Sequence, residues 1–308
     1  MARQNNIEET FLAYLWMLLG SIFFAMMALL AESLKEQFSY PWITMVRSGV
    51  ATVLAVGLTL TAGVRLVFLK PVTLWVRSLS GWASMICGFY AMTHYDVAIV
   101  LALSNMYPLW VAILSWPLLG ILPSKKTWVA LAISCLGMWL VYSSSLDAAS
   151  TESSLSSPET AIPAAIMAGM LSGVALINLH RVKDIDTRAV VSHFSGVATA
   201  CSLVVWLLIP VATPARQIDF AALARLIGVG VAATVGQLCL TKAFSTGTPA
   251  RVSVVGLSQV VVAALVKWYM EQRIPTMGSM LGIGLVVAST VWVILSQPTK
   301  EETNEPKK

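Results

Sequence analysis

The chain has 308 residues, of which 57% are hydrophobic and only 11% are charged, and its mean hydropathy is +0.78. Soluble domains carry a charge on about a quarter of their residues, so this composition excludes a soluble globular protein and indicates an integral membrane protein. The formal net charge of +5 is explained by basic loops and gives no reason to expect nucleic acid as a partner. The 4 Cys lie in apolar runs without CxxC or CxxH spacing, which implies neither a zinc site nor a disulfide framework, and we expect no cofactor.

Ten apolar runs of membrane-spanning length follow one another along the chain, since about 20 residues suffice to cross a bilayer as an α-helix. The first, near 12–32, follows an acidic stretch, which favours a retained span over a cleaved signal peptide. No run alternates with period two, so the predicted fold class is an all-α integral membrane protein. The other nine predicted spans lie near 42–62, 72–93, 97–119, 126–143, 161–180, 189–210, 221–243, 249–270 and 277–296.

Basic residues are distributed unequally between the loops, which predicts the orientation. With both termini in the cytoplasm, the outer loops hold only Lys35, Arg216 and Arg273. We therefore expect a multi-pass protein of the cytoplasmic (inner) membrane whose termini are both cytoplasmic. The inner loops and tails then hold Arg3, Arg65, Lys70, Lys125, Lys126, Arg181, Lys183, Arg188, Lys300, Lys307 and Lys308.

The second half of the sequence repeats the first. A shift of 152 places sets Ala91–Leu119 beside Ala243–Glu271, and SGVAT at Ser48–Thr52 recurs at Ser195–Thr199. Five spans in each half invert the second half relative to the first, a pattern typical of transporters. The predicted organisation is a first five-helix repeat over 11–145, an external Ser-rich linker over 146–160, a second repeat over 161–297 and a cytoplasmic tail over 298–308.

The repeated segments resemble a known family. PARVSVVGLSQVVVAALVKWYMEQRIP, preceded by GQLCLTKAF, is similar to the second-half signature of the drug/metabolite transporter superfamily, specifically its EamA-type ten-helix members. PWITMVRSGVA and GFYAMTHYDVAIVLALSNMYPLWVAIL match the first-half pattern, so the resemblance extends from about Tyr14 to Leu295. It implies two inverted five-helix repeats and transport of a small metabolite, more often out of the cell than into it. Members usually close the fourth and ninth helices with Gly-Glu, whereas Gly120-Ile121 and Glu271-Gln272 stand here, so any role of the first acidic residue is absent.

Charged residues inside the predicted spans are candidate substrate contacts, because a charge at mid-bilayer costs about 2.5–3.5 kcal/mol on insertion scales. We expect Arg47 to pair with Glu32 or to bind a substrate carboxylate or phosphate, with Glu32 itself a second candidate ligand-facing group. Arg251, near the inner end of the ninth span, is predicted to bind a lipid headgroup, the substrate or a gating carboxylate. Lys267 is expected to pair with Glu271 one turn further on.

Polar and aromatic residues complete the candidate site. Pro108 predicts a bent or broken fourth span, and broken backbone is tolerated where it lines a cavity. Tyr107 and Trp110, with Trp82 and Tyr90 of the third span, are expected to form an aromatic wall beside it. The alternative role of Gln237 is interhelical hydrogen bonding, and His193 is either a hydrogen-bonded helix contact or a proton relay. The full set of predicted substrate-binding residues is Glu32, Arg47, Trp82, Tyr90, Asn105, Tyr107, Trp110, Asn178, His193, Gln237, Arg251, Ser258 and Gln259; no catalytic or metal-binding residue is predicted.

These observations predict a secondary transporter, with an exporter of an amino-acid-, nucleotide- or vitamin-like metabolite favoured, working by alternating access around a central cavity. No GxxxxGK[ST] motif occurs, which argues against an ATP-driven pump. A membrane-embedded enzyme is one alternative, but its nearest constellation is His94 with Asp96, and we predict no enzymatic activity. A channel is the other, and it normally shows a ring of like charges or a filter loop. The expected partners are a small-molecule substrate and the lipid bilayer, and the protein is expected to be a monomer or homodimer.

Overall fold

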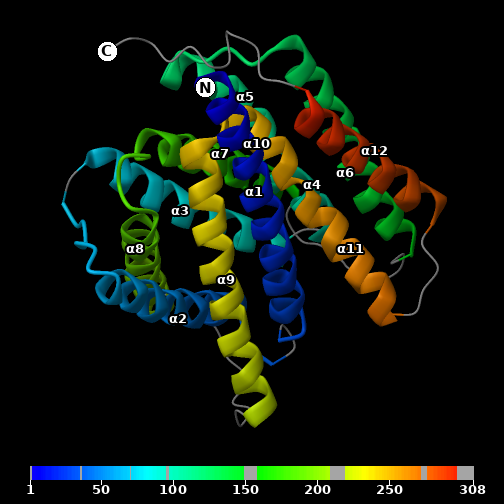
Figure 1. Ribbon diagram of the computed structural model, residues 1–308. Helices are drawn as coiled ribbons and strands as arrows, with labels where there is room; N and C mark the ends of the chain where they lie inside the picture. Colours follow the sequence, from blue (N-terminus) through cyan, green and yellow to red (C-terminus); the bar gives the residue numbers. More distant parts are fainter. Residues whose placement is uncertain are drawn as a thin grey trace.

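The computed structural model describes residues 2–34, 37–69, 71–94, 97–148, 158–208, 219–271 and 276–296, and these ranges contain twelve helices and no strand (Figure 1). The all-α prediction is therefore confirmed for this part of the chain. The helices are α1 (Ala2–Glu32), α2 (Tyr40–Thr61), α3 (Val72–His94), α4 (Val97–Ser104), α5 (Tyr107–Leu119), α6 (Lys125–Ala148), α7 (Pro158–Arg181), α8 (Thr187–Leu208), α9 (Phe220–Thr246), α10 (Pro249–Gly256), α11 (Ser258–Glu271) and α12 (Met277–Leu295).

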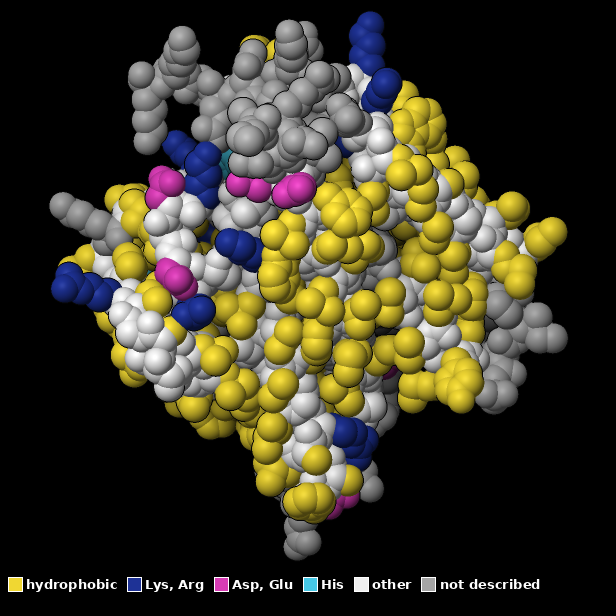
Figure 2. Space-filling view, viewed as in Figure 1, with side chains coloured by type: hydrophobic (Ala, Val, Ile, Leu, Met, Phe, Trp, Pro, Cys, Tyr) yellow, Lys and Arg dark blue, Asp and Glu magenta, His cyan; other side chains and the backbone are white. Residues whose placement is uncertain are grey.

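Nine helical segments of the described residues are long and apolar enough to cross a membrane. Of the ten predicted spans only α3 falls short, because its 23 residues include the buried polar residues Arg77, Ser78, Ser80 and Ser84. Since α3 packs against both α7 and α8, these side chains face protein. Figure 2 shows a largely hydrophobic middle on one face of the molecule, with charged side chains toward its margins and at the end where α9 begins.

Two predicted spans are each built from two shorter helices. The fourth breaks between α4 and α5 at Asn105 and Met106, as Pro108 predicts, because proline has no N–H to donate to the preceding turn. The ninth predicted span, near 249–270, is divided as well: α10 ends at Gly256, and α11 begins two residues later. The shift of 152 places sets the 8 residues of α4 on the 8 residues of α10, so the two breaks coincide in the repeat.

Helix packing follows the same repeat. α3 packs chiefly on α7 and α9 chiefly on α1, while α2 packs on α8 and α6 on α12. The two SGVAT copies meet at their last residues, because the hydroxyls of Thr52 and Thr199 lie 2.9 Å apart and each also bonds the carbonyl four residues earlier. The Ser134 and Ser289 hydroxyls, 2.6 Å apart, join α6 to α12 in the same way. These reciprocal contacts mark a pseudo-two-fold relation between helices; the domain boundaries stay a prediction.

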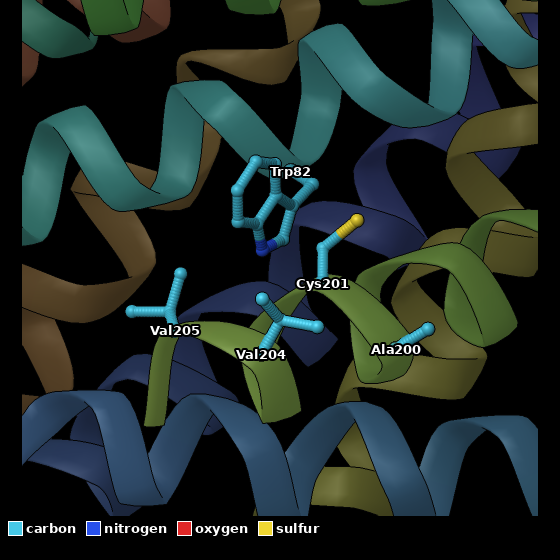
Figure 3. Close-up of a pocket in the computed structure, with 5 residues that line it drawn as sticks. All are labelled: Trp82, Ala200, Cys201, Val204 and Val205. Carbon is cyan, nitrogen blue, oxygen red and sulfur yellow. The ribbon is translucent and has the colours of Figure 1, made fainter. Parts of the chain in front are cut away.

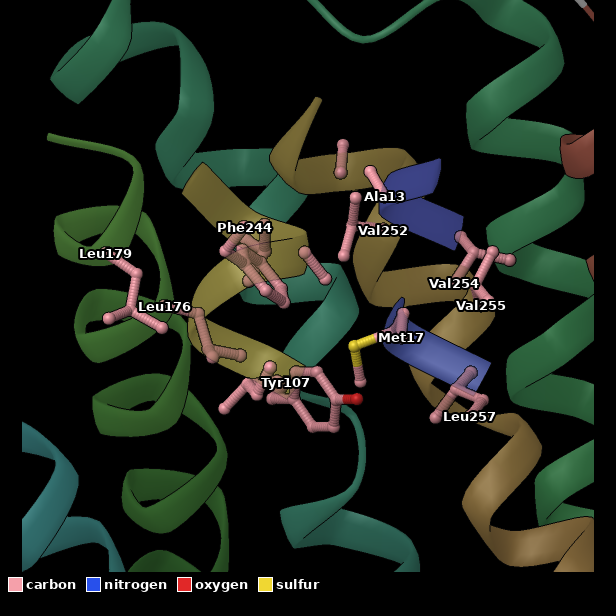
Figure 4. Close-up of a cluster of buried hydrophobic side chains, with 14 of the residues drawn as sticks. Ala13, Met17, Tyr107, Leu176, Leu179, Phe244, Val252, Val254, Val255 and Leu257 are labelled. Atoms are coloured by element: carbon pink, nitrogen blue, oxygen red, sulfur yellow. The ribbon is translucent and has the colours of Figure 1, made fainter. Parts of the chain in front are cut away.

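The largest hydrophobic cluster lies toward the end of the molecule at which α1 begins and α12 ends, and it draws on α1, α3 and α5 to α12. Met17, Tyr107 and Phe244 converge there, with the Tyr107 side chain pointing toward Met17 (Figure 4). A smaller cluster near the opposite end joins Leu34, Phe38 and Leu226. Both broken spans therefore contribute to the largest hydrophobic cluster, the fourth through α5 and the ninth through α10 and Val261 of α11.

Candidate functional site

The two helix breaks lie against each other. Gln259, in the first turn of α11, donates from Nε2 to Oδ1 of Asn105 at the α4/α5 break, with 3.2 Å between the atoms. Tyr107, in the first turn of α5, sets its hydroxyl against Gly256 at the α10/α11 break, where an added Cβ would collide with it. The shift of 152 places sets Tyr107 on Gln259, so α5 and α11 occupy equivalent positions in the repeat, and each contributes one side chain to the break in the other span. Three predicted site residues are thus brought together.

Further polar groups surround this crossing. Asn105 also donates from Nδ2 to the Tyr142 hydroxyl at 3.2 Å, and Ser21 of α1 donates to the Gly256 carbonyl at 3.4 Å. The buried hydroxyl of Ser258, a fourth predicted residue, has no hydrogen-bond partner within the part of the chain that the structure describes. A buried polar atom without a partner costs free energy, so this hydroxyl is available to a ligand. The crossing offers neutral donors and acceptors suited to a polar solute.

A second buried polar cluster centres on Arg77 of α3, which is 2% exposed. Its Nη2 donates to Oε1 of Gln237 at 2.8 Å, and its guanidinium lies 3.7 Å from the ring centroid of Phe194. Gln237 was predicted from sequence, but Arg77 was missed, although an arginine inside the apolar run 72–93 is by default a functional candidate. The cluster joins α3, α8 and α9 through one buried cation.

His193 lies beside this cluster and contacts two residues of α3. Its Nδ1 is 2.9 Å from the Ser78 hydroxyl, and its ring meets the Trp75 ring edge-on with the centroids 4.8 Å apart. The interhelical alternative proposed for His193 is therefore the contact that the structure shows, between α8 and α3. Its contact with a substrate stays a prediction.

The expected Glu32–Arg47 pair is not formed. Arg47 donates instead to the thioether sulfurs of Met27 and Met85, at 3.4 and 2.8 Å. Glu32 pairs with Lys267 at 2.9 Å, because α11 packs along α1 and brings that lysine to the end of α1. Both side chains of the pair are about half exposed, so the ion pair is accessible to solvent. The predicted Lys267–Glu271 pair involves a glutamate side chain outside the described residues.

The expected aromatic wall is not assembled, because its members face different neighbours. Trp82 donates to the Ser202 hydroxyl at 3.2 Å and borders an apolar cavity of about 230 Å³ with Ala200, Cys201, Val204 and Val205 of α8 (Figure 3). Trp110 fills a notch at Gly169 and Gly173 of α7. Tyr90 is exposed and donates to Thr160 at 3.2 Å. Asn178, also predicted, donates to the Val174 carbonyl of its own helix at 2.9 Å.

Arg251 lies apart from both clusters, toward the end at which α12 finishes. It is 1% exposed, and its guanidinium donates to the Tyr14 hydroxyl and to the carbonyls of Val293 and Ser296. These contacts tie α10 to α1 and α12. The geometry favours a clamp between helices, and the contact of Arg251 with a lipid, substrate or carboxylate stays a prediction.

Comparison with known proteins agrees with this architecture. A model of the EamA-like transporter family matches residues 11–143 and 160–295. The pseudopaline exporter CntI of Pseudomonas aeruginosa, from strains UCBPP-PA14 and PAO1, is 26% identical over 280 residues, which cover 89% of this chain and 92% of the relative. A solved protein crystal structure aligns with a TM-score of 0.78 at 16% identity, covering 91% of this chain and 95% of its own; it supports the fold alone.

Proposed function

The chain belongs to the EamA-like transporter family, and from this premise we propose that it exports a small organic metabolite across the cytoplasmic membrane by alternating access. One observation carries the proposal: the two broken helices meet face to face at polar side chains. Discontinuous helices at a repeat interface are the usual setting of substrate sites in secondary transporters. The name of the relative, an exporter, supports the outward direction.

The proposed site lies at the crossing of the breaks. Substrate replaces the Asn105–Gln259 hydrogen bond with bonds of its own, and the Ser258 hydroxyl supplies a further contact. Exchanging one hydrogen bond for others changes the free energy little, so binding and release stay reversible. The Arg251 clamp holds one end of the bundle together, and access from that end requires its contacts with Tyr14 and α12 to separate.

The proposal is tested by solute flux into lipid vesicles that contain only this protein. The solutes are labelled amino acids, nucleosides, vitamins, organic acids and cationic drugs. Saturable flux that speeds up when unlabelled solute is present on the opposite side is the expected result. Ion current that does not saturate indicates a channel, and chemical conversion of a solute indicates an enzyme; either result without saturable flux contradicts the proposal.

The same assay tests the site. Asn105→Ala and Gln259→Ala each remove one partner of the central hydrogen bond, and we expect each to lower flux by roughly tenfold, which corresponds to about 1.4 kcal/mol. Thr61→Val is the matched control, because the exposed Thr61 hydroxyl bonds only carbonyls of its own helix. Unchanged flux in both amide variants would place the substrate elsewhere in the bundle.

A further inference from the structure

Residues of three helices surround the guanidinium of Arg77 within the bundle. Gly81, one turn further along α3, leaves the space that the arginine needs, since an added Cβ would lie 3.0 Å from the Phe194 ring and 3.4 Å from Nη1 of Arg77. The guanidinium lies over the ring of Phe194 on α8, and its Nη2 donates to Gln237 on α9. Three helices therefore fix the orientation of this one buried cation.

Among the described residues, no carboxylate pairs with the positive charge of Arg77. The ion pair that joins two described side chains is Lys267–Glu32, near the end of α1. Gln237 is a neutral acceptor, and the buried Nε of Arg77 has no hydrogen-bond partner among the described residues. A buried charge normally has a counter-charge or lines a solute path. The Nε–H of Arg77 is therefore a buried donor whose hydrogen bond is not satisfied by the described residues.

Arg47 repeats this arrangement nearby. It donates to the Met85 sulfur, and Met85 lies on α3 eight residues after Arg77, about 12 Å along the helix axis. A thioether is a weak acceptor, so Arg47 also has no anionic partner among the described side chains. Two guanidiniums, Arg77 of α3 and Arg47 of α2, therefore contact side chains along α3 or its neighbours, and neither is paired with a carboxylate of the described residues.

We propose that Arg77 binds a carboxylate group of the transported solute, with Gln237 and Phe194 holding the guanidinium in place. A guanidinium binds a planar carboxylate through charge-assisted hydrogen bonds. A carboxylate carries one negative charge and neutralises Arg77, whereas a phosphate monoester carries nearly two. This inference rests on the proposed function and names its substrate class as organic acids, amino acids included.

The test compares acids with their amides on the purified full-length protein in neutral detergent. The probes are glutamate with glutamine, succinate with succinamide, and benzoate with benzamide, and the readouts are the thermal unfolding midpoint and calorimetric affinity. At least one acid is expected to stabilise the protein while its amide does not. Arg77→Gln is expected to weaken acid binding by on the order of tenfold or more. Arg65→Gln is the control, because it removes the same charge from the exposed α2–α3 connection. This variant is expected to bind acids with the affinity of the unaltered protein.

A second variant keeps the proposal testable if Arg77→Gln does not fold. Gln237→Glu places a carboxylate on the atom position that already contacts Nη2, so it should occupy Arg77 internally and abolish acid binding. Acid binding of undiminished strength in Gln237→Glu or Arg77→Gln, or equal binding of acids and amides, would overturn the proposal. So would stabilisation by phosphatidylglycerol in the absence of any acid effect, which would assign Arg77 to a lipid headgroup. Saturable vesicle flux of neutral solutes that persists in Arg77→Gln would reject this inference and leave the transport function intact.

Discussion

At the scale of single residues, Arg251 shows how a buried cation can serve the fold. Its donors reach Tyr14 and two carbonyls near the end of α12. We predict that Arg251→Ala lowers the free energy of unfolding by about 3 kcal/mol, because hydrogen bonds to a charged group contribute about 1.5–3 kcal/mol each and their partners would stay buried. Tyr14→Phe, which removes one acceptor, should cost about 1–2 kcal/mol. Thermal unfolding in detergent checks both, and an Arg251→Ala midpoint at or above that of Tyr14→Phe would contradict the clamp.

The sequence identified several polar residues of the helix breaks and the buried cluster correctly, but it did not predict which residues they contact. Asn105, Gln237 and Gln259 stood out because polar side chains are rare in apolar runs, and the structure gives each of them a partner from a distant helix. Those partners depend on helix packing, which periodicity within one helix does not encode. Arg77 carried the same signal and was overlooked. Of the two roles expected for Arg47, the pair with Glu32 is not formed, because Glu32 reaches Lys267 instead; substrate binding by Arg47 stays a prediction.

At the scale of helices, α6 and α12 pack at two glycines. A Cβ added to Gly137 would lie 2.6 Å from the Gly282 carbonyl oxygen, and a Cβ on Gly282 would meet the Gly137 carbonyl and Val141. Gly282→Ala should therefore destabilise the protein by about 1–3 kcal/mol, the usual cost of overpacking. Gly284→Ala is the matched change on the same helix, with open space around the new Cβ, and should be neutral or stabilising by up to about 1 kcal/mol. Equal unfolding midpoints for the two variants would disprove close packing at Gly137 and Gly282.

The positions of the membrane-spanning helices were largely predictable, because a segment that crosses the bilayer needs an apolar run of about 20 residues, which is visible in the sequence. Pro108 also revealed the break between α4 and α5, since a missing N–H is visible in the sequence. The break between α10 and α11 has no proline, and only Gly256 marks it. In the structure, α10 occupies the same place in the second repeat as α4 does in the first. Alignment of the two repeats therefore indicates the second break, whereas the helix propensity of the local sequence does not.

At the scale of the whole molecule, the repeat places matching elements opposite each other. The Thr52–Thr199 and Ser134–Ser289 contacts join equivalent helices, and the two breaks meet with Tyr107 and Gln259 reaching in opposite directions. We propose that this arrangement opens in two equivalent ways, one toward each side of the membrane. This is the structural basis for the proposed alternating access.

The measurement that tests this account most directly is flux through protein whose two breaks are linked. Cys87, Cys135, Cys201 and Cys239 are first replaced by Ala, and then Asn105→Cys and Gln259→Cys are joined by a short bifunctional methanethiosulfonate. The unlinked double-cysteine protein should show lowered but measurable flux of the first solute found to saturate in vesicles, because the Asn105–Gln259 hydrogen bond is lost. This residual flux should stop on linking and return on reduction, while each single-cysteine protein should keep, after treatment, most of the flux that it has untreated. Undiminished flux in protein shown by mass spectrometry to be linked would contradict a substrate path through the crossing of α4/α5 and α10/α11.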